Sequence, residues 1–167
     1  MTPGSRVLDV GGGTSTLVDD LLDRGVSDIT VLDLSEQALR VSKERLGPRA
    51  VGVRWIAADL LEEPLPAGGF DLWHDRAVLH FLVDPHDAKR YVEQARHALR
   101  PGDHAVIGGF APDGPERCSG LTVARRSGAE IIALFGDGFT LIEQHHERHR
   151  TPGGTEQSFL WSVLRRC

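Results

Sequence analysis

Short apolar runs alternate with stretches of helical periodicity along the chain. The runs are rich in Val, Ile and Leu, and they predict strands at 7–10, 28–33, 53–57, 70–75 and 104–110. Apolar positions three and four residues apart predict helices at 17–23, at 36–46 after a Ser35 cap, and at about 85–99. Strands that alternate with helices indicate an α/β fold with a mainly parallel sheet.

The C-terminal third departs from this alternation. We expect a turn at 100–103, a loop at 112–120 and a helix at 123–134. Two final strands, at 139–149 and 156–164, are expected to pair antiparallel around Thr151-Pro152-Gly153-Gly154.

Composition and charge narrow the class of protein. The 167 residues are read as one domain, 1–167, long enough for a sizeable core. A net charge of −5 at pH 7 argues against a nucleic-acid binder that neutralises phosphates. The sequence shows no membrane span and no signal peptide, and Cys118 and Cys167 make no disulfide framework. These features predict a reduced, cytoplasmic protein that binds neither nucleic acid nor membrane.

The most informative stretch is the first strand with the turn that follows it. Gly11, Gly12 and Gly13 let the backbone turn tightly and approach a ligand with no Cβ in the way. Thr14 or Ser15 is placed to cap the next helix, whose N-terminus suits a carboxylate or phosphate. We therefore expect a ligand pocket to begin at this glycine turn.

Three acids follow the first three strands. We expect Asp9, Asp33 and Asp59 to lie just beyond strand ends, and so on one rim of the sheet, where α/β folds bind ligands. Asp33 comes about 20 residues after the glycine turn, the spacing of an acid that binds ribose hydroxyls. Each acid alone is equally well a solvated loop residue. Together with the glycine turn they favour a nucleoside site.

Two nucleotide fingerprints are absent. The dinucleotide motif G-x-G-x-x-G requires a third glycine, where this chain has Thr16, and this argues against NAD. The phosphate-loop ending Gly-Lys-Ser/Thr is missing as well, because the only lysines are Lys43 and Lys89.

The motifs in their order resemble those of class I S-adenosylmethionine-dependent methyltransferases. The resemblance covers nearly the whole chain and rests on five segments, each of them weak alone: Val7-Leu8-Asp9-Val10-Gly11-Gly12-Gly13, Val31-Leu32-Asp33-Leu34-Ser35, Ile56-Ala57-Ala58-Asp59-Leu60, Phe70-Asp71-Leu72-Trp73 and Leu99-Arg100-Pro101-Gly102. It implies a Rossmann-like, doubly wound, mostly parallel sheet of seven strands in the order 3-2-1-4-5-7-6, with strand 7 antiparallel. The predicted C-terminal strand pair agrees with that order.

The resemblance also implies S-adenosyl-L-methionine as cofactor and a set of residues that hold it. Asp9, Gly11, Gly12 and Gly13 would surround its methionine part, with the amino group on Asp9. Asp33 would hold the ribose, Leu34 would pack on the adenine, and Asp59 with the Leu60 backbone would receive the adenine amino group.

The chain departs from the family at its start, because it begins almost at the first strand and lacks the usual N-terminal helices. Either this is a shortened form, or a partner subunit, as in a homodimer, supplies the cover, or the site is open.

Candidate groups for the methyl acceptor follow the fourth strand. They are His74, Asp75, Arg76 and His80, of which Asp75 and His80 are our catalytic candidates. The alternatives are a helix-face histidine for His80 and a plain ion pair with Arg76 for Asp75. His145, His146 and His149 are read as a solvated strand face, so no metal site is predicted.

We therefore predict an S-adenosylmethionine-dependent methyltransferase that acts on a small molecule. A protein-lysine methyltransferase is the first alternative. A cofactor-binding module without catalysis and a nicotinamide oxidoreductase are the others.

Overall fold

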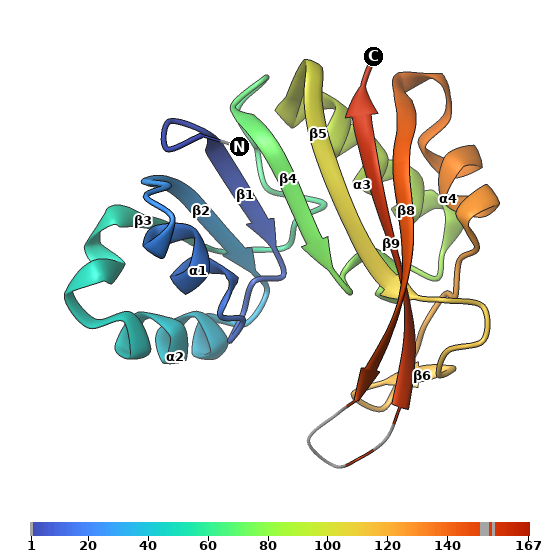
Figure 1. Cartoon of the computed structure of the whole chain (residues 1–167), viewed down its shortest axis with the longest axis horizontal. Helices are drawn as coiled ribbons and strands as arrows, with labels where there is room; N and C mark the ends of the chain where they lie inside the picture. The colour runs from blue at the N-terminus through green and yellow to red at the C-terminus, as the bar shows by residue number, and fades with distance from the viewer. Residues whose placement is uncertain (1, 151–153, 155) are drawn as a thin grey trace.

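The fold is built on one seven-stranded sheet, which the computed structural model shows among its described residues, 2–150, 154 and 156–167. The strand order is β3-β2-β1-β4-β5-β9-β8 (Figure 1). The strands are β1 (Arg6–Val10), β2 (Asp28–Asp33), β3 (Val53–Ala57), β4 (Phe70–Arg76), β5 (Leu99–Phe110), β8 (Phe139–Arg150) and β9 (Glu156–Arg166).

The pairing confirms the predicted topology. Strands β1 to β5 pair in parallel, and β9 pairs antiparallel with both β5 and β8. This is the predicted order 3-2-1-4-5-7-6. The labels differ only because a short two-stranded hairpin, β6 (Arg117–Cys118) with β7 (Leu121–Thr122), precedes the last two strands.

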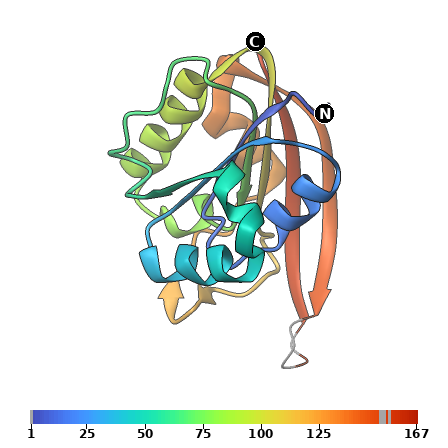
Figure 2. The same ribbon diagram turned by 90° about the vertical axis from the view of Figure 1, so that its left-hand side faces the viewer.

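Helices lie on both faces of the sheet. On one face α1 (Leu17–Asp23) and α2 (Glu36–Leu46) cover β1 to β3, and on the other α3 (Pro85–Ala98) and α4 (Gly128–Phe135) cover β4, β5 and β9 (Figures 1 and 2). Strand β1 serves both layers, because Val7 packs with the α1–α2 side and Leu8 with the α3–α4 side. Among the described residues, no helix covers β4, β5, β9 and β8 on the α1–α2 side (Figure 1).

Local signals account for the helix ends. The Ser35 hydroxyl accepts the Ala38 N–H at the start of α2, and Gly47, with φ of 56°, ends that helix. At α1, Ser15 Oγ accepts the Leu17 N–H, while the cap position itself is Thr16, whose side chain makes no cap bond.

The prediction was wrong for the segment after β5. The expected loop at 112–120 contains β6 and leads into β7, and α4 begins at Gly128 rather than at 123. Ser127 is the cause, because its side chain and Glu130 form a capping box that sets the first turn. Residues 123–127 instead run as an extended strap, whose Ala124 N–H donates to the His80 carbonyl.

Smaller differences concern strand ends. The expected turn at 100–103 lies inside β5, as residues without partners in β4, between the pairs Phe70–Leu99 and Leu72–His104. Strands β8 and β9 extend slightly further than expected. Thr151, Pro152 and Gly153 of the predicted turn lie outside the described residues.

The helices that the structure describes are all too short or too polar to span a membrane.

The buried residues of β1 contribute to the stability of the fold. Leu8 is fully buried, so Leu8→Ala is expected to lower the free energy of unfolding by about 3 kcal/mol through lost contacts and a cavity. Val51→Ala is the control, because Val51 is 91% exposed and should change stability little. Urea unfolding measures both, and a loss for Leu8→Ala no larger than that for Val51→Ala would contradict the account.

Candidate active site

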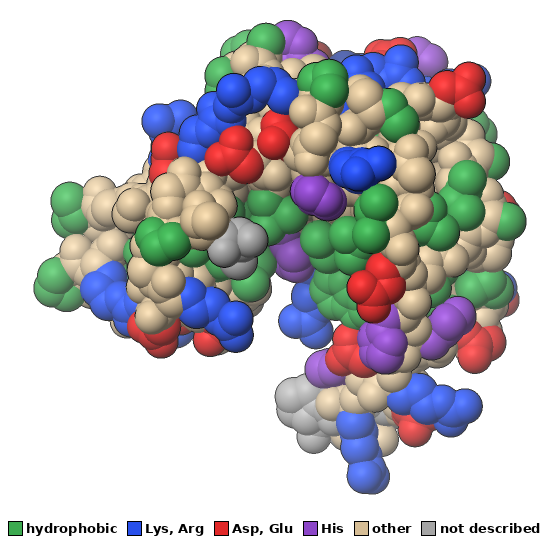
Figure 3. All heavy atoms as spheres, turned by 45° about the horizontal axis from the view of Figure 1, so that its top comes forward, with side chains coloured by type: hydrophobic (Ala, Val, Ile, Leu, Met, Phe, Trp, Pro, Cys, Tyr) green, Lys and Arg blue, Asp and Glu red, His purple; other side chains and the backbone are tan. Residues whose placement is uncertain are grey.

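The carboxyl ends of β1 to β4 meet at one edge of the sheet, where the glycine turn crosses over β2. The Gly11 N–H donates to the Leu32 carbonyl at 2.7 Å, so the turn lies against the end of β2. In the space-filling view the surface is hollowed between the part that holds α1 and α2 and the part that holds the β8–β9 end (Figure 3).

The three glycines are required by geometry. Gly11 and Gly13 adopt positive φ angles of 66° and 37°. At Gly12 a Cβ would lie 2.5 Å from Asp9 Oδ2 and equally close to Val31 Cγ1. The turn therefore passes within contact distance of a buried carboxylate, which a side chain at Gly12 would displace.

Side chains of helix α2 donate hydrogen bonds to the backbone carbonyls of the glycine turn. The buried Ser42 hydroxyl donates to the Gly13 carbonyl at 2.7 Å. The Arg45 guanidinium donates to the carbonyls of Thr14 and Ser15 and pairs with Asp19 at 2.8 Å. The backbone carbonyls of the turn are thus bound on the helix side.

Asp9 lies within β1 rather than beyond it, which corrects the prediction, and it is only 2% exposed. Its Oδ1 lies 2.8 Å from Nδ1 of His74, its register partner on β4. Its Oδ2 is buried and has no hydrogen-bond partner among the described residues. An unpartnered buried carboxylate oxygen is costly, and it suits a ligand that brings a cationic donor.

Asp33 and Asp59 lie on the neighbouring strand ends. The Ala58 N–H donates to the Asp33 carbonyl at 3.1 Å, which brings the two segments together. Each carboxylate accepts one local backbone N–H, Asp33 from Ser35 and Asp59 from Leu61, and each keeps a second oxygen. Such acceptors at the sheet edge suit hydroxyl or amino donors of a ligand.

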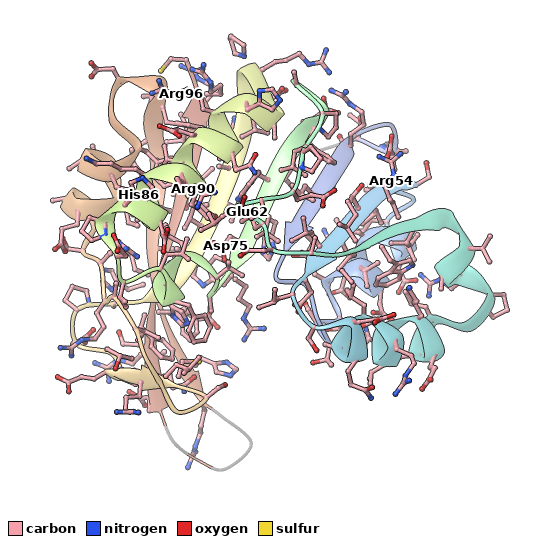
Figure 4. All side chains as sticks on the ribbon, turned by 180° about the vertical axis from the view of Figure 1, so that it is seen from behind. Arg54, Glu62, Asp75, His86, Arg90 and Arg96 are labelled. Carbon is pink, nitrogen blue, oxygen red and sulfur yellow. The ribbon has the colours of Figure 1, made fainter. Side chains whose placement is uncertain are left out.

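Leu34 and Leu60 differ in exposure. Leu34 is 78% exposed beside the glycine turn, where a planar apolar group would cover it. The Leu60 side chain is buried, and its carbonyl accepts from Gln94 at 2.8 Å. An ion pair of 2.7 Å between Glu62 and Arg90 also joins this loop to α3 (Figure 4). The structure thus places the eight predicted cofactor residues along one edge of the sheet, while their role stays a prediction.

Asp75 lies on the face of β4 opposite to His74 and is fully buried beneath α3 (Figure 4). Its carboxylate accepts the Tyr91 hydroxyl at 2.6 Å and the backbone N–H groups of Val78 and Leu79 at 2.7 and 2.9 Å. Trp73 Nε1 donates in turn to the Tyr91 hydroxyl. Burial raises the pKa of Asp75 to about 6, and the hydrogen bonds from Tyr91, Val78 and Leu79 limit that rise.

This network shapes the segment that faces the glycine turn. Ala77 adopts a φ of 72°, a strained value for a residue with a Cβ. Val78 then lies against Gly11, where a Cβ would overlap its Cγ2 methyl. Asp75 therefore acts on the glycine turn through the backbone of 77–79.

His80 lies on a 3₁₀ turn and is 2% exposed, with its ring against Phe81 and Phe110. Neither ring nitrogen has a hydrogen-bond partner among the described residues. Burial, together with the charge of Arg126, lowers the pKa of His80 to about 4, so the imidazole is neutral at pH 7. The ring borders a cavity of about 20 Å³, which has room for one water molecule.

The strap 123–127 closes this cavity. Arg126 donates to the carbonyls of Leu79 and Leu82 at 2.8 and 2.6 Å. It thereby fixes both sides of the turn that carries His80.

The sequence did not reveal three of these contributors. In the sequence, Tyr91 and Arg126 are ordinary residues of predicted helices, and nothing there links the candidate His74 to Asp9. The strand register Asp9–His74 is the signal that identifies this pair, and register between strands 65 residues apart follows only from the folded sheet.

His145 and His146 are exposed and His149 is half-buried along β8.

Comparisons with known proteins agree with this geometry. Residues 7–102 match the family model described as a methyltransferase domain. The chain is 32% identical over 100 residues to a ubiquinone/menaquinone biosynthesis C-methyltransferase (UbiE) of Methylobacterium nodulans, covering 58% of this chain and 38% of that protein. It is 28% identical over 107 residues to the eEF1A lysine and N-terminal methyltransferase of Bos taurus, covering 64% of this chain and 15% of that protein.

A solved structure extends the likeness to the whole fold. An S-adenosylmethionine-dependent methyltransferase from Methanosarcina mazei superposes with a TM-score of 0.84 at 15% identity, covering 99% of this chain and 94% of that one. At this identity the likeness concerns the fold alone. The chain spans less than two fifths of the length of the two curated relatives.

The buried Asp75 predicts a pH dependence of stability. Its pKa is about 6 in the folded state and 3.8 ordinarily, so the folded state holds the proton more tightly. The stability from this group is fully present below pH 4 and is lost as the pH rises through 6, a change of about 3 kcal/mol.

Urea unfolding of the wild type and of Asp75→Asn at pH 4 and pH 7 measures this, because the asparagine does not titrate. We expect the wild type to lose stability relative to the variant as the pH rises. A difference between the two proteins that stays constant with pH would contradict the raised pKa.

Proposed function

The chain belongs to the class I S-adenosylmethionine-dependent methyltransferases, and on this premise we propose that it transfers a methyl group from S-adenosyl-L-methionine to a small-molecule acceptor. The observation that carries the proposal is the buried Asp9 carboxylate. Its buried Oδ2, which has no hydrogen-bond partner in the described part of the chain, lies directly beneath the glycine turn, with Asp33 at the end of the neighbouring strand.

The residues present fit this cofactor. Asp9 would accept from the ammonium group and Asp33 from the ribose hydroxyls. The exposed Leu34 would pack on the adenine, and Asp59, beside the Leu60 backbone, would accept from its amino group. A Cβ at Gly11, Gly12 or Gly13 would meet Val78, Asp9 or Asp33, so the backbone of the turn lies against two of the acids that would hold the cofactor.

The cofactor, when bound, supplies a methyl group already activated on a sulfonium. The protein therefore contributes chiefly alignment and exclusion of water. Asp75 supports alignment, because it holds the segment 77–79 against the glycine turn. His80 is our candidate for accepting a proton from the acceptor, because its ring nitrogens have no partner among the described residues. Its lowered pKa keeps the imidazole neutral and also makes it a weak base.

The acceptor class is inferred from the relatives. The UbiE relative carries a small-molecule biosynthesis in its name, which supports a small acceptor. The eEF1A relative supports a protein lysine as the second candidate.

Calorimetric titration tests the cofactor assignment. We expect micromolar binding of S-adenosylmethionine and S-adenosylhomocysteine and no binding of NAD. Binding of NAD alone, or of none of the three, would contradict the proposal. If both sulfur compounds bind but no methyl group is transferred to any small molecule or protein, the chain is a cofactor-binding module and not an enzyme.

Asp33→Ala tests the ribose assignment. The variant removes the carboxylate that would accept from the hydroxyls, so the dissociation constant for S-adenosylhomocysteine should rise by roughly 10- to 100-fold. Asp28→Ala is the matched control, because Asp28 is exposed at the other end of the same strand. An unchanged affinity in Asp33→Ala, measured by the same titration, would remove Asp33 from the site.

A further inference from the structure

We infer that His74 is a positioning residue for the cofactor: by holding Asp9, it keeps Asp9 Oδ2 free for the ammonium group of the methionine part. The inference rests on the proposed function, since it concerns the same cofactor. It adds a residue on β4 that neither the motifs nor the comparisons assign.

The contact itself is direct and well shielded from water. His74 Nδ1 lies 2.8 Å from Asp9 Oδ1, and the exposed fractions of the two side chains are 15% and 3%. A carboxylate oxygen only accepts, so Nδ1 carries the hydrogen and donates it. This bond fixes both the rotation of the carboxylate and the tautomer of the ring.

The second oxygen of Asp9 is what points to a ligand. Asp75, on the other face of β4, shows how this fold satisfies a purely structural carboxylate, because both of its oxygens accept hydrogen bonds from the protein. Asp9 is almost as deeply buried, yet its Oδ2 has no partner among the described residues. The protein keeps this oxygen desolvated and unpaired beneath Gly12, in the turn that we propose binds the methionine part of the cofactor.

Side chains from two further strands hold His74 in place. Its ring lies 5.9 Å from the Trp161 ring on β9, centroid to centroid, at an angle of 31°. Trp161 lies flat on β5, because a Cβ at Gly108 would be 2.6 Å from its ring. The Trp161 Nε1–H donates to Glu147 of β8 at 2.6 Å. His74 is therefore buttressed across the face of the sheet that has no helix among the described residues (Figure 1).

This arrangement makes Asp9 a prepared acceptor. A carboxylate free to rotate would turn Oδ2 toward water or a backbone N–H, and binding a cation would then require it to turn back. The His74 bond removes that freedom before the cofactor arrives, so less ordering remains to be done on binding.

Two nucleoside ligands separate this role from a structural one. S-adenosylhomocysteine has the ammonium group, whereas 5′-methylthioadenosine shares the adenosine and the sulfur but lacks the amino-acid part. We would measure both dissociation constants for the wild type, His74→Leu and His74→Asn by calorimetry, and the melting temperature of each protein. Asparagine places an N–H donor near the position of Nδ1 and so retains the bond to Asp9.

The expected result is selective. His74→Leu should bind S-adenosylhomocysteine about tenfold more weakly, and 5′-methylthioadenosine as the wild type does. His74→Asn should restore most of the lost affinity. His104→Leu, the same change on the neighbouring strand β5 and outside the site, should alter neither constant.

Three results would overturn the inference. They are an equal loss for both ligands in His74→Leu, no loss for either, or a folded His74→Asn that binds as poorly as His74→Leu. If the wild type binds neither nucleoside, the proposed function fails and the inference fails with it. If the wild type binds both and one of the three results appears, only the role of His74 is refuted.

Discussion

The buried carboxylate of Asp9 is the constraint around which the site is arranged. A buried carboxyl group of this kind persists only where the surrounding structure holds it, and here β4 contributes His74 while Gly12 packs against the second oxygen. Gly12 has no side chain because the carboxylate occupies that space. Helix α2 binds the turn from the other side through Ser42. The parallel order of the strands then brings Asp33 to the same edge.

Two buried carboxylates on opposite faces of the sheet have opposite roles. Asp9 Oδ2 has no partner among the described residues and is the atom that we propose binds a ligand, whereas Asp75 uses both oxygens to bind Tyr91 and the backbone after β4. The second supports the first, because Val78 of the segment that Asp75 holds lies against Gly11. His80 follows on the same segment and is enclosed by the strap 123–127. Arg126 of this strap donates to the carbonyls of Leu79 and Leu82. Residues 77–80 thus connect the glycine turn with the small cavity beside His80.

The sheet order and the placement of the three acids could be predicted, because periodicity defines the strands and parallel strands end at a common edge. The side-chain contacts of the buried acids could not be predicted. The pairs Asp9–His74 and Asp75–Tyr91 join residues far apart in the chain, and only strand register and helix docking bring them together. Residues 123–127 carry a helical pattern, yet the Ser127–Glu130 capping box begins α4 later and leaves them as a strap. The start of this helix is therefore set by the capping box and not by the spacing of apolar residues.

A crystal structure of the chain with S-adenosylhomocysteine tests the central claim most directly. The account predicts the ammonium nitrogen about 2.8 Å from Asp9 Oδ2, with the Asp9–His74 bond retained and the ribose hydroxyls on Asp33. An ammonium group bound elsewhere, with Asp9 Oδ2 still without a partner, would contradict it.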